Sequence, residues 1–372
     1  MIVLLSAIGL IYALYALWLL SMIVQWQRAD DVPETCTDAS HLTLIIPFRD
    51  EAEQLPALLS SLAKQMNEAP GVSIVLVDDH SSDNSLFIAE QFKKENPEVI
   101  IISQDETHGK KQGVDIALAQ VKTEWVVTLD ADIEPCEGWL KRIASWTKNN
   151  TNDLLILPLH IGPGSNLIGR LQEVEFASVM AITGGMALVG EPILCNGGNL
   201  CFRKEAYQRV RAQRTDMHIT SGDDVFLLNA LKPFGKVYWV HDPHVRVSTA
   251  PKTSWSTFAA QRLRWMGKAG FIRDKWLQST AWLAFLANSI FLITAIATLL
   301  GFFSWLPFLI LAAIKIVLDG WLIHRVGKWL CIKQLKRFYV LLIFIYPIYA
   351  TLFPLMSQIV KPSWKGRTTN NR

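Results

Sequence analysis

Two carboxylates separated by one residue, Asp130 and Asp132, directly follow an apolar run at residues 125–129. Hard cations such as Mg²⁺ or Mn²⁺ take oxygen ligands and complete their coordination with waters and phosphate oxygens. Two acidic side chains at one strand end therefore suit a metal that binds a phosphate-bearing ligand. An Asp-x-Asp triplet also occurs on solvated turns, so the pattern alone leaves metal binding and a plain turn as alternatives.

Two further side chains could contact the same ligand. Asp79 follows a second apolar run at residues 72–77, where its carboxylate could accept hydrogen bonds from a nucleotide base or ribose. The alternative role is capping of the helix predicted over residues 82–94. Lys110 offers a cation for phosphates or for a base carbonyl, although a surface lysine pair such as Lys110-Lys111 is common.

A second acidic pair, Asp223 and Asp224, follows Gly222 and precedes the apolar residues 225–228. This pattern is typical of the start of a helix, where the dipole favours anions. One of the two could act as a general base on an acceptor hydroxyl, because a neighbouring carboxylate can raise its pKa toward the working pH. A simple acidic first turn is the alternative.

Gln261, Arg264 and Trp265 occupy positions i, i+3 and i+4, and so share one face of a helix predicted over about residues 255–273. The arginine could neutralise a diphosphate leaving group, and the tryptophan could stack on an acceptor sugar. The basic and aromatic residues around them are also typical of an interfacial helix at a membrane surface.

The elements that must position these residues alternate between strand and helix. Apolar runs predict strands at residues 42–46, 72–77, 100–103 and 125–129, and helical periodicity predicts helices at residues 51–65, 82–94 and 113–120. Such alternation predicts a doubly wound, mostly parallel sheet, whose ligands bind beyond the carboxyl ends of the strands. Asp79, Asp130 and Asp132 are therefore expected to face one crevice.

Composition indicates that part of the chain lies in lipid. The 372 residues are 51% hydrophobic with 14 tryptophans, and the mean hydropathy is positive. Residues 1–27 predict an uncleaved anchor rather than a signal peptide, since a basic start and a small-residue cleavage site are missing. Residues 276–360 predict about three more spans, at 276–300, 302–323 and 338–360. Lys315 and Asp319 lie within the second of these, where we expect them to neutralise each other.

The distribution of charge suggests a membrane orientation. Basic residues between 325 and 337 favour the cytoplasmic side, which predicts a multi-pass protein of the cell membrane with its catalytic domain in the cytoplasm. The basic tail at residues 361–372 would then lie outside, against the same rule, unless one C-terminal segment is re-entrant. A net charge of +3 is too small to indicate nucleic-acid binding. Five cysteines without metal-binding spacing predict reduced thiols.

Together, these motifs resemble the membrane-integrated members of glycosyltransferase family 2, which include polysaccharide synthases and ceramide glucosyltransferase. The resemblance covers about residues 42–270 and the flanking hydrophobic segments. It implies a GT-A-type fold over a cytoplasmic domain at residues 41–270, and a nucleotide-sugar donor. It further implies that Mg²⁺ or Mn²⁺ is the cofactor.

The resemblance also implies roles for individual residues. It assigns nucleotide binding to Pro47, Arg49, Glu51, Asp79, Lys110, Asp130, Gln261, Arg264 and Trp265. The metal ligands would be Asp130 and Asp132, and the catalytic residues would be Asp224 as base, its neighbour Asp223, and Arg264 at the leaving group. Gly197-Gly198-Asn199 resembles an acceptor-side loop. Asp223 departs from the family pattern, in which a glutamate commonly precedes the base.

The implied reaction is a one-step inverting transfer of a hexose from a nucleotide sugar, most simply a UDP-sugar, to a hydroxyl of a membrane lipid or lipid-linked glycan. Processive polysaccharide synthesis and polyprenyl-phosphate sugar synthesis are the alternatives. The small number of C-terminal hydrophobic segments argues against extrusion of a long polymer.

Overall fold

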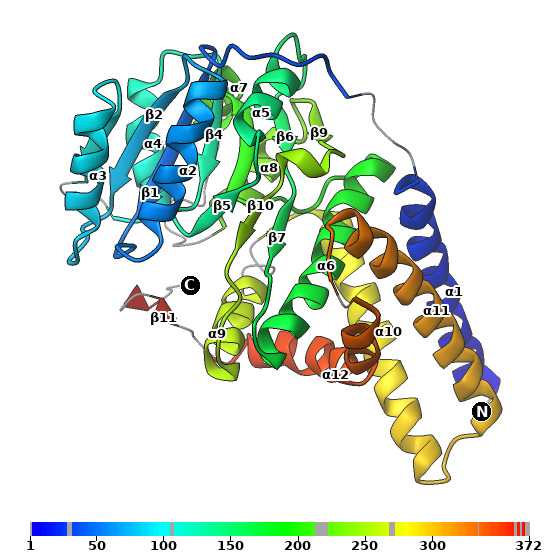
Figure 1. Cartoon of the computed structure of the whole chain (residues 1–372). Coiled ribbons are helices and arrows are strands. Elements are labelled where there is room, and N and C mark those ends of the chain that lie inside the picture. Colours follow the sequence, from blue (N-terminus) through cyan, green and yellow to red (C-terminus); the bar gives the residue numbers. More distant parts are fainter. Residues whose placement is uncertain are drawn as a thin grey trace. The chain divides into compact units, whose positions relative to one another are not determined.

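A computed structural model describes residues 2–27, 32–104, 108–212, 222–267, 272–333 and 335–360, together with the backbone of residues 363–364 and 367–368 (Figure 1). The chain forms two compact units, each assembled from separated segments. We call them the sheet unit, residues 29–160 and 194–250, and the helical unit, residues 1–28, 161–193 and 251–372.

Among the described residues, the sheet unit is built on seven strands in the order β3-β2-β1-β4-β8-β6-β9. Four neighbours are parallel, namely β3 (Ile100–Ser103), β2 (Ser73–Asp78), β1 (Leu42–Phe48) and β4 (Trp125–Leu129). Next to β4, strand β8 (Asn199–Arg203) runs antiparallel. It pairs in turn with β6 (Leu154–Ile156), which is parallel to β9 (Val237–Trp239).

The central strands are buried along their whole length. All seven residues of β1 and all five of β4 are buried, which matches the continuous apolar runs that a parallel sheet covered on both faces requires. Helix α4 (Lys110–Gln120) packs against β1 and β2. The remaining helices of this unit are α2 (Leu55–Glu68), α3 (Ser85–Glu95), α5 (Trp139–Thr147), α7 (Lys204–Arg211) and α8 (Asp223–Leu231).

A second sheet has the order β5-β10-β7, with bounds Ile133–Pro135, Val247–Thr249 and Leu159–Ile161. Strand β5 follows β4 by three residues, so the Asp130–Asp132 segment is the turn between the two sheets. A short 3₁₀ helix, Pro243–Val245, precedes β10.

The predicted fold class is confirmed. The strands at 100–103 and 125–129 have the predicted bounds, and the other two differ by one or two residues. Helix α2 starts at Leu55 rather than at residue 51. Residues 51–54 instead form a turn, in which the Gln54 N–H donates to the Glu51 carbonyl, and a proline occupies the first turn of the helix.

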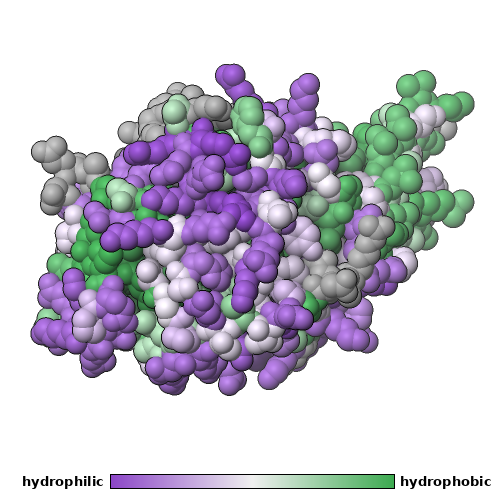
Figure 2. All heavy atoms as spheres, turned by 90° about the horizontal axis from the view of Figure 1, so that it is seen from above, coloured by the Kyte–Doolittle hydropathy of each residue, from purple (hydrophilic) through white to green (hydrophobic). Residues whose placement is uncertain are grey.

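In the described part of the helical unit, four helices are long and apolar enough to cross a membrane: α1 (Ile2–Gln25), α10 (Lys275–Leu299), α11 (Trp305–Trp329) and α12 (Leu335–Met356). Hydrophobic side chains cover much of their outer surface, which forms the green region at the right of Figure 2. Helix α12 contains Pro347 and Pro354 and changes direction along its length (Figure 1). Helix α11 continues six residues beyond the predicted end of its span at residue 323.

The sequence did not predict α6 (Leu167–Val189) as part of this unit. It packs against α1, α11 and α12, although it carries the buried acids Glu173 and Glu175. The compact units therefore divide the chain differently from the predicted continuous domain at residues 41–270, since residues 161–193 and 251–270 belong with the apolar helices. Helix α9 (Trp255–Met266) occupies the first part of the predicted 255–273 helix, and residues 268–271 lie outside the described residues.

Candidate functional site

The carboxyl end of β2 is tied to the beginning of α4 through Asp79. This side chain is 3% exposed, and its Oδ1 accepts the backbone N–H of Gly109 at 3.0 Å. Gly109 has a φ of 97°, in the left-handed region that glycine tolerates, and it directly precedes α4. This hydrogen bond fixes the start of α4 beside the sheet edge, and with it the position of Lys110, the first residue of the helix.

Lys110 brings together acids from two other segments. Its Nζ lies 2.6 Å from Asp130 Oδ1, at the end of β4, and 3.8 Å from Asp223 Oδ2, at the start of α8. Burial alone would lower the pKa of Lys110, but Asp130, Asp223 and Asp224 outweigh it and raise the pKa above its ordinary value. The ammonium group is therefore charged throughout the physiological pH range and holds negative charge around it.

The glycine loop before β8 completes this cluster. The Gly197 carbonyl accepts hydrogen bonds from Lys110 Nζ at 2.9 Å and from Thr128 Oγ1 at 3.1 Å, and the Gly197 N–H donates to Asp224 Oδ2 at 2.9 Å. Because β8 pairs antiparallel with β4, the loop reaches the end of β4 where Asp130 lies. A Cβ on Gly198 would lie 2.6 Å from Asp130 Oδ2, too close for any other residue to fit without displacing that carboxylate.

Asp223 and Asp224 lie in the first turn of α8, as the sequence predicts. Gly222 precedes them with a φ of 88°, a backbone angle that allows the abrupt entry into the helix. Both side chains are partly exposed. Asp224 accepts backbone N–H groups on both oxygens, from Gly197 and from Val225 at 2.8 Å. Each oxygen of a carboxylate has two lone pairs, so Asp224 retains the capacity to accept a proton from a ligand.

Asp132 lies two residues beyond Asp130 in the turn between β4 and β5, and its Oδ2 is 3.4 Å from Thr249 Oγ1 of β10. The side chain of Asp130 is 42% exposed, and Asp132 is also partly exposed. Two accessible carboxylates at one strand end form a donor set that fits Mg²⁺ or Mn²⁺, since these ions take one or two protein carboxylates and fill the remaining positions with phosphate oxygens and water.

The loop after β1 is held by the loop after β2. Asp50 has a φ of 49°, and its Oδ1 accepts the Ser82 N–H at 2.7 Å. That hydrogen bond lowers the pKa of Asp50. The Glu51 N–H donates to Ser85 Oγ at 2.7 Å. Arg49 and Glu51 therefore lie on a braced loop at the same sheet edge as Asp79, whereas Pro47 is a buried residue inside β1, paired with Val77.

Sequence reasoning missed two histidines beside Asp79. His80 Nδ1 lies 3.4 Å from Asp79 Oδ1 and 3.2 Å from His108 Nδ1, and the ligand atoms of the three residues lie within 4.8 Å of one another. This is a group that could hold a metal ion in the part of the chain described. The adjacent pair Asp79-His80 was visible in the sequence, but its approach to His108 depends on the placement of α4.

The Gln-x-x-Arg-Trp residues lie on α9 in the helical unit, where the arginine between them, Arg262, dominates the contacts. Arg262 is 1% exposed and forms a bidentate ion pair with Glu175 of α6. Its NH1 donates to Gln261 Oε1 at 2.5 Å, and its guanidinium lies 4.4 Å from the Trp265 ring centroid. Gln261 and Trp265 therefore hold Arg262, while Arg264 is partly exposed. The sequence did not predict this structural role.

Comparisons with known proteins agree with this architecture. Residues 43–211 match the family model described as Glycosyl transferase family 2. This is the family that the sequence motifs resemble. The matched range includes β1 to β4, and with them Asp79, Lys110, Asp130 and Asp132.

Curated relatives share part of the chain. A poly-beta-1,6-N-acetyl-D-glucosamine synthase of Staphylococcus epidermidis is 26% identical over 239 residues, which are 63% of this chain and 56% of the relative. The poly(ribitol-phosphate) beta-N-acetylglucosaminyltransferase TarS of Staphylococcus aureus is 30% identical over 119 residues, 32% of this chain and 20% of that protein. The chain thus spans about half the length of the first relative.

Among solved structures, the mannosyltransferase PcManGT from Pyrobaculum calidifontis, in complex with GDP-Man and Mn²⁺, has a similar fold. The TM-score is 0.58 at 17% sequence identity, over 95% of this chain and 97% of that one. This likeness confirms the GT-A-type fold.

The fit of Gly198 against Asp130 predicts the effect of a single methyl group. Gly198→Ala should displace the Asp130 carboxylate from Lys110 and lower the stability by about 1 kcal/mol or less, because the clash is with the end of a partly exposed side chain that can move away. Thermal unfolding of the purified protein measures this. Gly9→Ala is the control for a methyl group added where no atom lies within 4 Å. It should melt at or above the wild-type temperature, since alanine favours a helix more than glycine does; a Gly198→Ala melting temperature equal to that of the wild type would contradict the prediction.

The buried pair on α9 and α6 predicts a second effect. Arg262→Met leaves Glu175 without its cation and should cost about 3–5 kcal/mol of stability, whereas the double variant Arg262→Met/Glu175→Leu should recover most of that loss. Tryptophan fluorescence during thermal unfolding in detergent tests both. Arg264→Met on the same helix serves as the control, and a double variant less stable than Arg262→Met would show that the pair has another role.

Proposed function

We propose that this chain, whose residues 43–211 match the glycosyl transferase family 2 model, transfers a sugar from a nucleotide-sugar donor to a hydroxyl of a membrane lipid or lipid-linked acceptor. The observation that carries the proposal is the cluster in which Lys110 contacts both Asp130 and Asp223 and contributes, through Gly197, to the position of Asp224. It combines a cation, a candidate metal site and a candidate base at the carboxyl edge of a parallel sheet, where ligands of such folds bind.

The donor would bind along the ends of β1, β2 and β4. Asp79 and the braced loop of Arg49 and Glu51 would face the nucleoside, and Lys110 would contribute positive charge toward the diphosphate. Asp130 and Asp132 would hold Mg²⁺ or Mn²⁺, which when bound neutralises the diphosphate of the donor and of the leaving group. The mannosyltransferase of similar fold was solved with GDP-Man and Mn²⁺, which supports a nucleotide sugar and a divalent metal as ligand classes here.

Asp224 is the candidate general base. In the proposed step it takes the proton of the acceptor hydroxyl while that oxygen forms a bond to the anomeric carbon and the bond from that carbon to the diphosphate oxygen breaks. The configuration inverts, and the nucleoside diphosphate leaves with the bonding electrons. Asp223, 3.8 Å from the Lys110 ammonium, would keep this cation close to the base.

We also propose the roles that the family resemblance implies for Gln261, Arg264 and Trp265. Arg264 would neutralise the leaving diphosphate, and Trp265 would contact the acceptor. Gln261 and Trp265 also position Arg262 through the contacts described above. Substitution of these two residues would therefore alter α9 as well as any ligand contact.

Four apolar helices support a multi-pass protein of the cell membrane, and we propose that the catalytic unit is cytoplasmic. A membrane-embedded enzyme meets lipid acceptors directly, which favours transfer of one sugar to a lipid hydroxyl. The similarity to a poly-beta-1,6-N-acetyl-D-glucosamine synthase supports a second candidate, synthesis of a polysaccharide. The two candidates share the donor site and differ in the product.

One experiment tests the function and separates these candidates. The detergent-solubilised full chain is incubated with UDP-sugars and GDP-sugars, with and without Mn²⁺ or Mg²⁺, together with extracted membrane lipids. Nucleotide release is measured, and products are identified by mass spectrometry. A lipid carrying one sugar supports the first candidate and a polymer the second, while a folded protein that neither binds nor turns over any donor would refute both.

The metal assignment predicts that Asp132→Asn, which preserves shape but removes charge, lowers the rate about 100-fold or more, because a bound metal contributes several kcal/mol of charge stabilisation. Nucleotide binding measured by calorimetry should also lose its dependence on Mn²⁺. The exposed Asp38 provides the control as Asp38→Asn. A variant that retains Mn²⁺-dependent nucleotide binding would remove Asp132 from the metal site.

The base assignment predicts a different pattern for Asp224→Asn. The rate of sugar transfer should fall about 10²- to 10⁴-fold, the typical contribution of general-base catalysis, while the Kd for the donor changes little. Single-turnover kinetics and donor titration measure the two quantities separately. If Asp223→Asn lost transfer and Asp224→Asn retained it, the base would be Asp223.

A further inference from the structure

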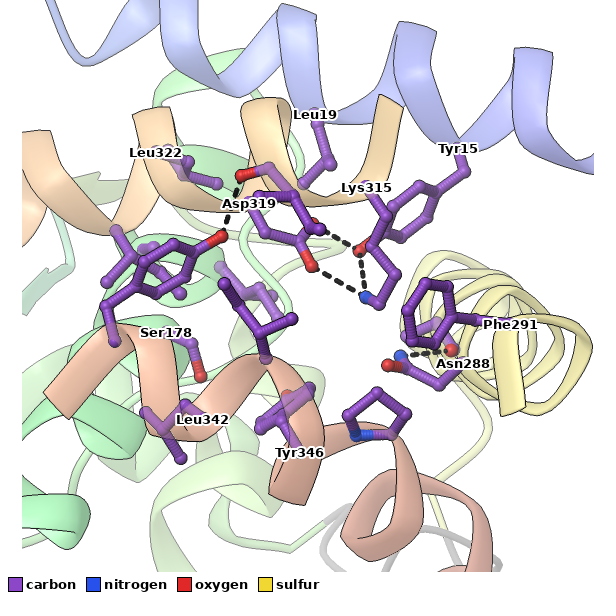
Figure 3. Close-up of a pocket in the computed structure, with 18 of the residues that line it drawn as sticks. Tyr15, Leu19, Ser178, Asn288, Phe291, Lys315, Asp319, Leu322, Leu342 and Tyr346 are labelled. Carbon is purple, nitrogen blue, oxygen red and sulfur yellow. Dashed lines mark hydrogen bonds and ion pairs between the residues drawn. The ribbon is translucent and has the colours of Figure 1, made fainter. Parts of the chain in front are cut away.

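A cavity lies inside the helical unit, between α1, α6, α10, α11 and α12 (Figure 3). Its volume is about 70 Å³, which is below the roughly 300–1,000 Å³ of sites that enclose a whole small molecule and is enough for the polar end of a lipid. Its walls are mainly aliphatic and aromatic, including Leu19, Phe291, Leu322 and Leu342. The transfer chemistry proposed above uses none of these residues.

An ion pair lies within this apolar surrounding. Lys315 Nζ is 2.6 Å from Asp319 Oδ2, and the Tyr15 hydroxyl donates to Asp319 Oδ1 at 2.6 Å. Lys315 is 4% exposed and also donates to the Tyr15 oxygen at 3.3 Å. Ionisable residues at membrane depth indicate function by default. As predicted, Lys315 and Asp319 neutralise each other. The Lys315 ammonium has three hydrogens, and one remains after the bonds to Asp319 and Tyr15.

The other acid at the cavity wall is neutralised as well. Glu175 lines the cavity, but both of its carboxylate oxygens accept hydrogen bonds from Arg262. Among the described lining residues, each charged group therefore has an opposite charge in contact with it. The cavity presents polar groups without a net charge, which disfavours a phosphate-bearing occupant.

Asn288 supplies the polar group that calls for a ligand. The residue is 1% exposed, and its Nδ2 donates to the Ala284 carbonyl at 2.7 Å. That carbonyl can only accept, so the amide nitrogen faces it and Oδ1 is directed away from it. Oδ1 is buried and has no hydrogen-bond partner. Figure 3 shows this oxygen directed into the cavity, on the side of Tyr346 and Lys315. A buried acceptor without a donor is costly, by about 1–3 kcal/mol.

We propose that this cavity binds an uncharged lipid with a free hydroxyl, of the diacylglycerol class. The lipid hydroxyl would donate to Asn288 Oδ1, the remaining ammonium hydrogen of Lys315 would reach an ester carbonyl, and the acyl chains would extend from the cavity along the apolar helices. A phosphatidylcholine has no donor for Asn288, and a phosphatidic acid would bring a charge to a neutralised site. The inference deepens the proposed function and rests on it for the lipid's role as acceptor, but lipid binding itself needs no turnover.

The test uses the full chain in lipid nanodiscs and a photoactivatable diacylglycerol. Labelling of the wild-type protein should be competed by dioleoylglycerol and not by dioleoylphosphatidylcholine or dioleoylphosphatidic acid. Asn288→Leu, similar in size but without the acceptor, should weaken labelling about fivefold to tenfold, the loss expected for one buried hydrogen bond. Ser289→Ala is the matched control, because Ser289 bonds Thr351 and does not line the cavity.

Peptide mapping of the labelled wild-type protein makes the test independent of how well the variants fold. Labels on α1, α10 or α11 within the cavity support the proposal. Labels confined to the outer surface, equal competition by phosphatidylcholine, or unchanged labelling of a folded Asn288→Leu variant would overturn it. Donor-dependent nucleotide release is measured in parallel, so a failure of the catalytic proposal is distinguished from a failure of the lipid site.

Discussion

The candidate site depends on one ammonium group. Lys110 lies at the start of α4 and contacts Asp130 from β4, Asp223 from α8 and the Gly197 carbonyl from the loop before β8. Without a cation, carboxylates brought so close would repel one another. With it, they can be held at one sheet edge before any ligand arrives. The raised pKa of Lys110 reflects the same interaction, since the charged form is favoured by the carboxylates it holds.

Glycine makes this arrangement geometrically possible. Gly197 and Gly198 run between Asp224 and Asp130 at distances that leave no room for a side chain on Gly198. The backbone amide and carbonyl of Gly197 are then free to bond to both sides of the cluster. Backbone groups on a strand-anchored loop are less mobile than side chains, which suits a site that must hold several polar groups in fixed positions.

In the helical unit, too, opposite charges lie in contact, and there the pairing allows charged side chains to be buried. Arg262 with Glu175, and Lys315 with Asp319, each place opposite charges in direct contact. Pairing offsets much of the penalty of removing ions from water, so charged residues can occupy helices that are otherwise apolar. Asn288 Oδ1 differs, because it is buried without a donor. This buried acceptor without a donor makes the apolar cavity a candidate lipid site.

The sequence by itself determined the four parallel strands β1 to β4 and the helices between them, because parallel strands buried on both faces read as apolar runs and their helices keep a regular period. It also determined where the polar residues leave the strands, so that Asp79 and Asp130 were expected at one edge, and it located the apolar helices by their length and composition. These features are local and need no knowledge of the rest of the chain.

Only the tertiary structure decided which of these groups meet. The contact between Lys110 and Asp223 joins residues over one hundred positions apart, and depends on the pairing of β8 with β4. The sequence did not predict helix α6, which carries the acids Glu173 and Glu175. In the structure it packs against apolar helices, and Arg262 on α9 neutralises Glu175. The family motif on α9 points to Arg264, and only the structure shows that its neighbour Arg262 is buried and paired with Glu175. Spacing along a helix specifies which side chains share a face, whereas the partner across that face is specified by packing between distant segments.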